Sequence, residues 1–314
     1  MQLSIHRYCF SCQVDTMNNT LKENGPELDR SNMAYAIVYG CIMVLGLPLN
    51  AVSLWILIRR HSLKSPSAVF MINLALSDLL LVISLPMRVY FYATGSWPLG
   101  ITACVLIIMF FHNNLRSSSI FITFIGVDRL LAVVYPLRSR HLRSTSNAWK
   151  ASAFAWIFVL VMHIPENINL STYLYNCNAS TCFEFPNCKE YRSAFPYLQA
   201  ALVFTMLAVN VVSTAMVSWT LRRHLSDSAR VNNKMNVMLV FAMNLIMFII
   251  CFFPLSLALL LNNGKNAIMP TVCLASMNCC LDPLLYYFSL DAFWKKKEDM
   301  DIAREQVKTR DVKS

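Results

Sequence analysis

Residues 36–58 read AIVYGCIMVLGLPLNAVSLWILI, a run without a single charged side chain. A helix needs about 20 mostly apolar residues to cross a bilayer, so this run predicts a membrane-spanning helix. Working outward along the chain, comparable runs predict seven spans: Ala36–Ile58, Val69–Met87, Val105–Val127, Ala151–Pro165, Ala200–Leu221, Val237–Leu261 and Ala267–Leu290. The sequence therefore predicts an all-α membrane protein, a seven-transmembrane-helix bundle.

The composition points to the same class. The 314 residues are 56% apolar and 14% charged, whereas a soluble chain carries about 25% charged residues. No repeat or low-complexity linker indicates a separate soluble domain. We expect three parts: an extracellular segment at 1–32, the seven-helix domain at 33–290 and a cytoplasmic tail at 291–314.

Basic residues are concentrated on one side of the predicted bundle. With the amino terminus outside, 19 Lys and Arg residues fall in inner segments and six in outer segments. Because inner loops carry the excess of basic residues, we predict a multi-pass plasma-membrane protein with an extracellular amino terminus. Topology and attraction to anionic membrane lipids then account for the net charge of +10, and nucleic acid is a poor explanation.

The predicted outer side carries modification signals. Triplets beginning at Asn18 and Asn178 predict glycosylation there. Cysteines cluster on the same side, where disulfides persist: Cys9, Cys12, Cys104, Cys177, Cys182 and Cys188. Sequence alone leaves the pairing of Cys9, Cys12, Cys177 and Cys188 open. No signal-peptide pattern opens the chain, and either Met1 or Met17 is the start.

Several motifs fall in order within the predicted spans: Asn50, Asn73–Asp78, Asp128–Leu130, Trp156, Cys251–Pro254 and Asp282–Tyr286. Together they resemble those of the rhodopsin-like (class A) G-protein-coupled receptors over nearly the whole chain. The stretches Leu85–Tyr92, Cys182–Phe185 and Asn278–Ser289 are most similar to the purinergic and lysophosphatidic acid receptor branch.

The resemblance implies a receptor that acts on a heterotrimeric G protein and is not an enzyme. It also implies a disulfide between Cys104 and a second-outer-loop cysteine, for which Cys182 is the best match. Apolar rings beside lysines in Asp291–Lys297 predict a short amphipathic eighth helix on the inner leaflet.

The resemblance also implies a switch at the inner end of the bundle. Asp128 is expected to hold Arg129 in an ion pair at rest, and Arg129 is released toward the G protein on activation. Pro254 removes a backbone hydrogen bond and predicts a bend in the sixth helix. Pro283 and Tyr286 give the seventh helix a similar joint.

Two intramembrane carboxylates, Asp78 and Asp282, suggest a functional cluster. The resemblance implies a sodium ion or a proton shared with further polar residues: Asn50, Asn114, Ser118 and Asn278. An aspartyl protease dyad is disfavoured because no Gly-x-Gly-Asp setting surrounds Asp282. A retinal protein is disfavoured because the seventh span has no lysine for a Schiff base.

The predicted ligand is anionic. Phe111 stands where aminergic receptors carry an aspartate, which argues against an amine. Arg88 lies roughly 15 Å beyond Asp78 at 1.5 Å per residue, and arginine suits phosphate and carboxylate. By resemblance Arg88 meets a phosphate head group. The alternative is that Arg88 snorkels to the interface.

Further ligand-binding candidates are Tyr92, His112, Arg116 and Lys265. Lys265 is a plausible second contact at the outer end of the sixth span. For Arg116 the alternative is a structural polar network with His112, His163 or the fifth helix. No metal site is predicted, because no ligand set surrounds the two histidines.

We therefore predict a receptor for a lysophospholipid such as lysophosphatidic acid, with a nucleotide or a small carboxylic acid as the alternative. The sequence departs from the family pattern at several positions, Leu130 and Phe252 among them. An atypical or constitutively active orphan receptor is therefore a further alternative. A transporter or channel is disfavoured because no inverted repeat is seen.

Overall fold

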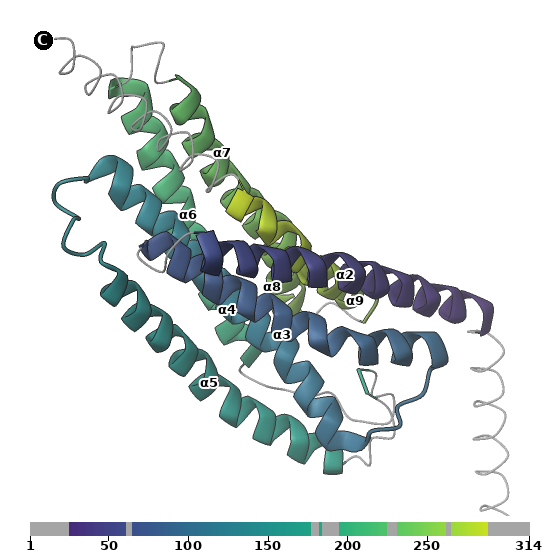
Figure 1. The fold of residues 1–314 in the computed structure, drawn as a ribbon. Helices are drawn as coiled ribbons and strands as arrows, with labels where there is room; N and C mark the ends of the chain where they lie inside the picture. Colours follow the sequence, from purple (N-terminus) through teal and green to yellow (C-terminus); the bar gives the residue numbers. More distant parts are fainter. Residues whose placement is uncertain are drawn as a thin grey trace, which may run out of the picture.

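The computed structural model describes residues 25–60, 65–176, 182–183, 195–224, 231–261 and 265–287. Figure 1 shows long helices side by side in one bundle, with α5 along its edge. The elements are α2 (Gly25–Arg60), α3 (Pro66–Thr94), α4 (Gly100–Val134), α5 (Thr145–Asn176), α6 (Phe195–His224), α7 (Val231–Met247), η3 (Phe248–Phe252), α8 (Phe253–Leu260) and α9 (Lys265–Ser276). A further helical segment covers 278–287.

Seven helical stretches of the described chain are long and apolar enough to cross a membrane, which confirms the predicted bundle. The fourth is longer than predicted, because α5 extends from Thr145 to Asn176. The prediction ended this span before Glu166. That carboxylate is buried in a polar network rather than placed at an interface, so the helix continues through it.

The outside of the bundle is apolar, as a lipid-facing surface requires. Several large apolar side chains on it are more than 60% exposed: Val44, Ile83, Phe154 and Trp219. Soluble proteins rarely expose such extended apolar surface. The exposure therefore agrees with a chain whose solvent is the bilayer.

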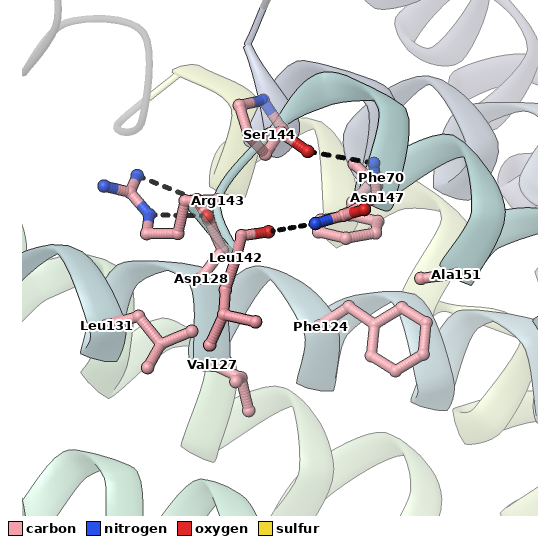
Figure 2. Close-up of a pocket in the computed structure, with 12 residues that line it drawn as sticks. Phe70, Phe124, Val127, Asp128, Leu131, Leu142, Arg143, Ser144, Asn147 and Ala151 are labelled. Atoms are coloured by element: carbon pink, nitrogen blue, oxygen red, sulfur yellow. Dashed lines mark hydrogen bonds and ion pairs between the residues drawn. The ribbon is translucent and has the colours of Figure 1, made fainter. Parts of the chain in front are cut away.

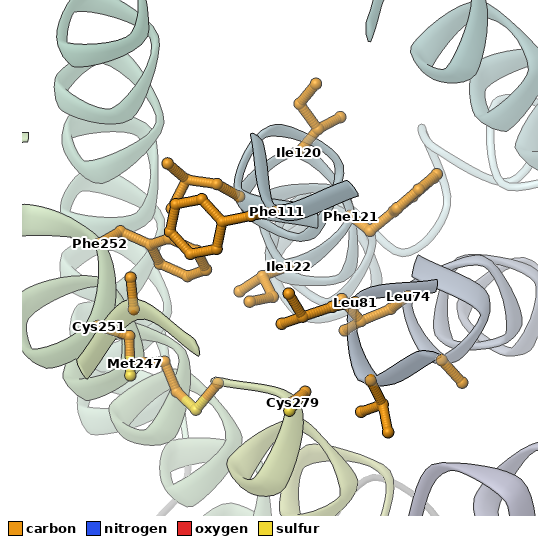
Figure 3. Packing of buried hydrophobic residues seen from close by; sticks show 14 of the residues in the cluster. Leu74, Leu81, Phe111, Ile120, Phe121, Ile122, Met247, Cys251, Phe252 and Cys279 are labelled. Carbon is orange, nitrogen blue, oxygen red and sulfur yellow. The ribbon is translucent and has the colours of Figure 1, made fainter. Parts of the chain in front are cut away.

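The interior combines an apolar core with buried polar residues on α3 and α4. Figure 3 shows Phe111, Phe252, Cys251 and Met247 within the main core cluster. Elsewhere a small residue allows two helices to pack closely. A Cβ atom added to Gly126 of α4 would lie only 2.9 Å from Asn210 Oδ1 of α6.

The sixth span is interrupted by a π-helical turn, η3, between α7 and α8. Pro254 follows directly in the first turn of α8, where a missing backbone N–H costs little. A π turn therefore lies directly before Pro254, and the bend expected at Pro254 stays a prediction. Such π turns occur frequently at functional sites.

Candidate functional site

Arg88 lies on α3 inside an aromatic cage. Its side chain is only 4% exposed, and its guanidinium carbon lies 4.5 Å from the ring centre of Phe183, 5.0 Å from Phe111 and 5.7 Å from Tyr39. A cation over an aromatic face within about 6 Å is attracted by the ring. These four residues form what we call the Arg88 cage.

The positive charge in this cage has no acidic partner among the described residues. No carboxylate there forms an ion pair with Arg88, and its Nε has no hydrogen-bond partner in that part of the chain. The side chain is buried in the bundle, so the snorkelling alternative is wrong. Because a buried charge is costly without a counter-charge, the cage is suited to an anion.

The covalent anchor of the cage is the disulfide Cys104–Cys182, which confirms the predicted pair. It joins the first turns of α4 to the residue before Phe183. Phe183 has a φ of 68°, a conformation that non-glycine residues rarely adopt. Its ring stacks on Tyr92 at 6.1 Å, and the Tyr92 hydroxyl donates to the sulfur of Met269 at 3.2 Å. Tyr92 thus packs against a ring of the cage.

A cavity of about 250 Å³ lies next to the cage, between α4, α5, α6, α8 and α9. Phe111 lines this cavity and also lies against Arg88, so its ring belongs to both the cavity wall and the cage. The wall is mainly apolar: Ile108, Leu115, Leu170, Leu255, Leu259, Ile268 and Val272. Its polar edge consists of His112, Arg116, Glu166 and Gln199.

Arg116 belongs to a closed polar network rather than to an open anion site. Its NH1 atom lies 2.7 Å from Glu166 Oε2 and 3.1 Å from His163 Nδ1. Its Nε donates to Gln199 Oε1 at 2.8 Å. His112 Nδ1 lies 3.1 Å from Glu166 Oε1. The polar-network alternative for Arg116 thus describes the structure, and Glu166 neutralises the arginine.

Sequence reasoning missed Glu166, although a signal was present. Glu166 follows His163 by three residues, so the two share a helix face, and they lie 3.4 Å apart. Extending the fourth span past Pro165 would have placed an intramembrane acid beside the intramembrane Arg116.

The central polar cluster lies deeper in the bundle. Asn114 Nδ2 donates to Asp78 Oδ1 at 2.9 Å and to Ser118 Oγ at 3.0 Å. Asn278 donates to Asn114 at 3.3 Å. The structure therefore brings together four of the residues predicted for this cluster. Asn50 instead donates to backbone carbonyl oxygens, that of Cys279 at 2.6 Å among them.

Asp78 and Asp282 are both fully buried and interact with each other. Within the described residues, Oδ2 of Asp78 and both carboxylate oxygens of Asp282 lack a hydrogen-bond partner. Two neighbouring buried carboxylates require a proton or a cation. Hard cations prefer oxygen ligands, so this donor set fits a sodium ion.

At the opposite end of the bundle, the predicted pair of Asp128 with Arg129 is replaced by another. Asp128 Oδ1 accepts from Arg143 Nε at 2.8 Å, and its other oxygen accepts from the Ser67 hydroxyl. Figure 2 shows Arg143 beside Asp128, and both residues line a pocket of about 180 Å³. The turn after α4 brings Arg143 back onto the carboxylate, and Arg129 Nε has no partner in the described chain.

Tyr286, predicted to take part in the switch, is buried in the helical segment 278–287. Its hydroxyl has no hydrogen-bond partner among the residues described. Pro283 lies three residues before it within the same helical segment. Lys265 opens α9, but its side chain lies outside the described part, as do Asn18, Asn178 and the predicted eighth helix.

Comparisons with known proteins agree with this arrangement. The model of the 7 transmembrane receptor (rhodopsin family) matches residues 49–286. Lysophosphatidic acid receptor 6 of Homo sapiens is 33% identical over 300 residues, covering 88% of this chain and 87% of that protein. Lysophosphatidic acid receptor 4 of Mus musculus is 34% identical, covering 82% and 75%. A purinoceptor of Gallus gallus is 29% identical, covering 92% and 88%.

Proposed function

Because this chain belongs to the rhodopsin family of seven-transmembrane receptors, we propose that it binds an extracellular anionic lipid, lysophosphatidic acid in the first place, and activates a heterotrimeric G protein. The proposal places it in the plasma membrane with the amino terminus and the disulfide outside. The ligand then enters from the end of the bundle that holds the Arg88 cage.

The Arg88 cage carries the proposal. A buried guanidinium with no carboxylate partner in the described chain and three rings around it provides charge and bidentate donors for a phosphate. The relatives named for lysophosphatidic acid support this ligand class. The apolar cavity beyond Phe111 offers space for a hydrocarbon tail next to the head group.

The Arg116 network favours the lipid over a nucleotide. A nucleotide carries several phosphates and calls for several unpaired cations. Arg116 is neutralised by Glu166 at 2.7 Å, which leaves Arg88 as the unpaired arginine of this region among the described residues. A ligand with one phosphate and an apolar tail needs no second free arginine in this region. A nucleotide, suggested by the purinoceptor relative, remains the second candidate.

Signal transfer is proposed to use the opposite end. Arg129 has an unpartnered Nε there among the described residues, and the π turn η3 interrupts the helix that would swing outward. A sodium ion or proton at Asp78 and Asp282 is proposed to stabilise the resting arrangement, since three of their oxygens accept no hydrogen bond from any other residue of the described chain.

The test is a G-protein activation assay in cells that express the full chain. Wild type is exposed to oleoyl lysophosphatidic acid, to nucleotides and to small carboxylic acids, with surface level measured by antibody. We expect a dose-dependent response to the lipid that Arg88→Ala abolishes. Arg30→Ala serves as control, because Arg30 is exposed at the same end of the bundle. An unchanged response in Arg88→Ala contradicts the proposal.

A further inference from the structure

The Arg88 cage contains a second donor without a strong partner among the described residues, the hydroxyl of Tyr39 on α2. Tyr39 is completely buried, with a relative exposure of 0%. Its hydroxyl has no hydrogen-bond partner of normal geometry among the described residues. Its polar neighbour is the thiol of Cys273, a weak hydrogen-bonding group. A buried hydroxyl without a strong partner is uncommon and calls for an explanation.

The position of the Tyr39 ring is fixed by its neighbours. The ring stacks on Tyr92 at 5.7 Å with an interplanar angle of 17°, and the Arg88 guanidinium lies 5.7 Å from its centre. Two helices therefore contribute one donor each without a strong partner among the described residues, Arg88 Nε from α3 and Tyr39 Oη from α2, to the Arg88 cage.

We propose that Tyr39 is a second direct contact of the anionic head group and helps the receptor select a phosphate. A phosphate oxygen accepts both from the guanidinium and from the tyrosine hydroxyl, and hydrogen bonds to a charged group are stronger than neutral ones. The inference rests on the proposed function, since it assigns a further residue to the same site. The head group then satisfies both buried donors at once.

The experiment compares Tyr39→Phe, which removes only the hydroxyl, with Tyr90→Phe. Tyr90 is 42% exposed on α3 and provides a matched control outside the cage. In the G-protein assay with oleoyl lysophosphatidic acid, Tyr39→Phe should lose potency about ten- to hundredfold at equal surface level. Tyr90→Phe should respond as wild type does. Monooleoylglycerol, which has the tail without the phosphate, should be inactive on all variants.

The outcomes separate this inference from the proposed function. If Tyr39→Phe keeps wild-type potency while Arg88→Ala loses the response, Tyr39 is not a contact and the proposed function stands. If wild type responds to no lipid, the proposed function fails and a second measurement decides on Tyr39.

That second measurement uses inorganic phosphate on the purified full chain in detergent. Phosphate should raise the melting temperature over chloride at equal ionic strength, since a ligand that binds the folded state stabilises it. Tyr39→Phe should need about tenfold more phosphate for the same shift. An equal phosphate dependence in both proteins, or none in wild type, overturns the inference.

Discussion

Removing Glu166 should destabilise the bundle strongly, because Arg116 would keep its charge in a site with 2% exposure. In Glu166→Leu, Gln199 and His163 still contact the guanidinium, at 2.8 and 3.1 Å, but neither supplies a negative charge. Breaking one side of a buried ion pair costs about 3–5 kcal/mol. At roughly 2–4 °C per kcal/mol, the melting temperature should fall by about 6–20 °C.

The double variant Arg116→Met/Glu166→Leu provides the decisive comparison. Replacing both members of a buried pair by apolar residues of similar size is often neutral or stabilising. We therefore expect the double variant to recover most of the loss, as measured by thermal unfolding of the purified protein in detergent. A double variant less stable than Glu166→Leu would refute the reasoning from buried charge.

The same double variant tests the role of Arg116 in binding. If Arg116 is structural, the folded double variant should respond to lysophosphatidic acid with a potency near that of wild type. Loss of the response at normal surface level and normal melting temperature would make Arg116 a ligand contact after all.

Two smaller perturbations test the packing. Gly126→Ala places a Cβ 2.9 Å from Asn210 Oδ1 and should cost about 1–3 kcal/mol by overpacking; Gly40→Ala, with no atom within 4 Å, is the control. An equal melting temperature for the two glycine variants would contradict this account. Arg143→Ala leaves the buried Asp128 carboxylate, 4% exposed, without its counter-charge and should cost about 1–3 kcal/mol in thermal unfolding. An unchanged melting temperature in Arg143→Ala would contradict this account of the buried carboxylate.

The bundle could be predicted from the sequence because each span is a long apolar run that needs no partner to be recognised. The grouping of Asn114 with Ser118 was predictable as well, since residues four apart share a helix face. The disulfide followed from the family resemblance and is present in the structure.

Other features depend on tertiary contacts that leave little mark in the sequence. Glu166 looked like the end of a span because a lone charge cannot be told from a paired one without its partner. The partner of Asp128 is Arg143, fifteen positions further along the chain, and the turn between them decides the pairing. The orphan hydroxyl of Tyr39 becomes visible only when its surroundings are known.

The π turn η3 changes the direction in which the side chains of the two halves of the sixth span point. Asn244 and Phe252, both buried, are eight residues apart, which in an uninterrupted α-helix would rotate them about 80° from each other. A π turn absorbs one additional residue, so the separation counts as seven α-helical steps and the offset shrinks to about 20°. The π turn thus aligns the inward faces of the two halves, and if it became a regular α-helical turn with the same number of residues, Asn244 and Phe252 would lie about 80° apart around the helix.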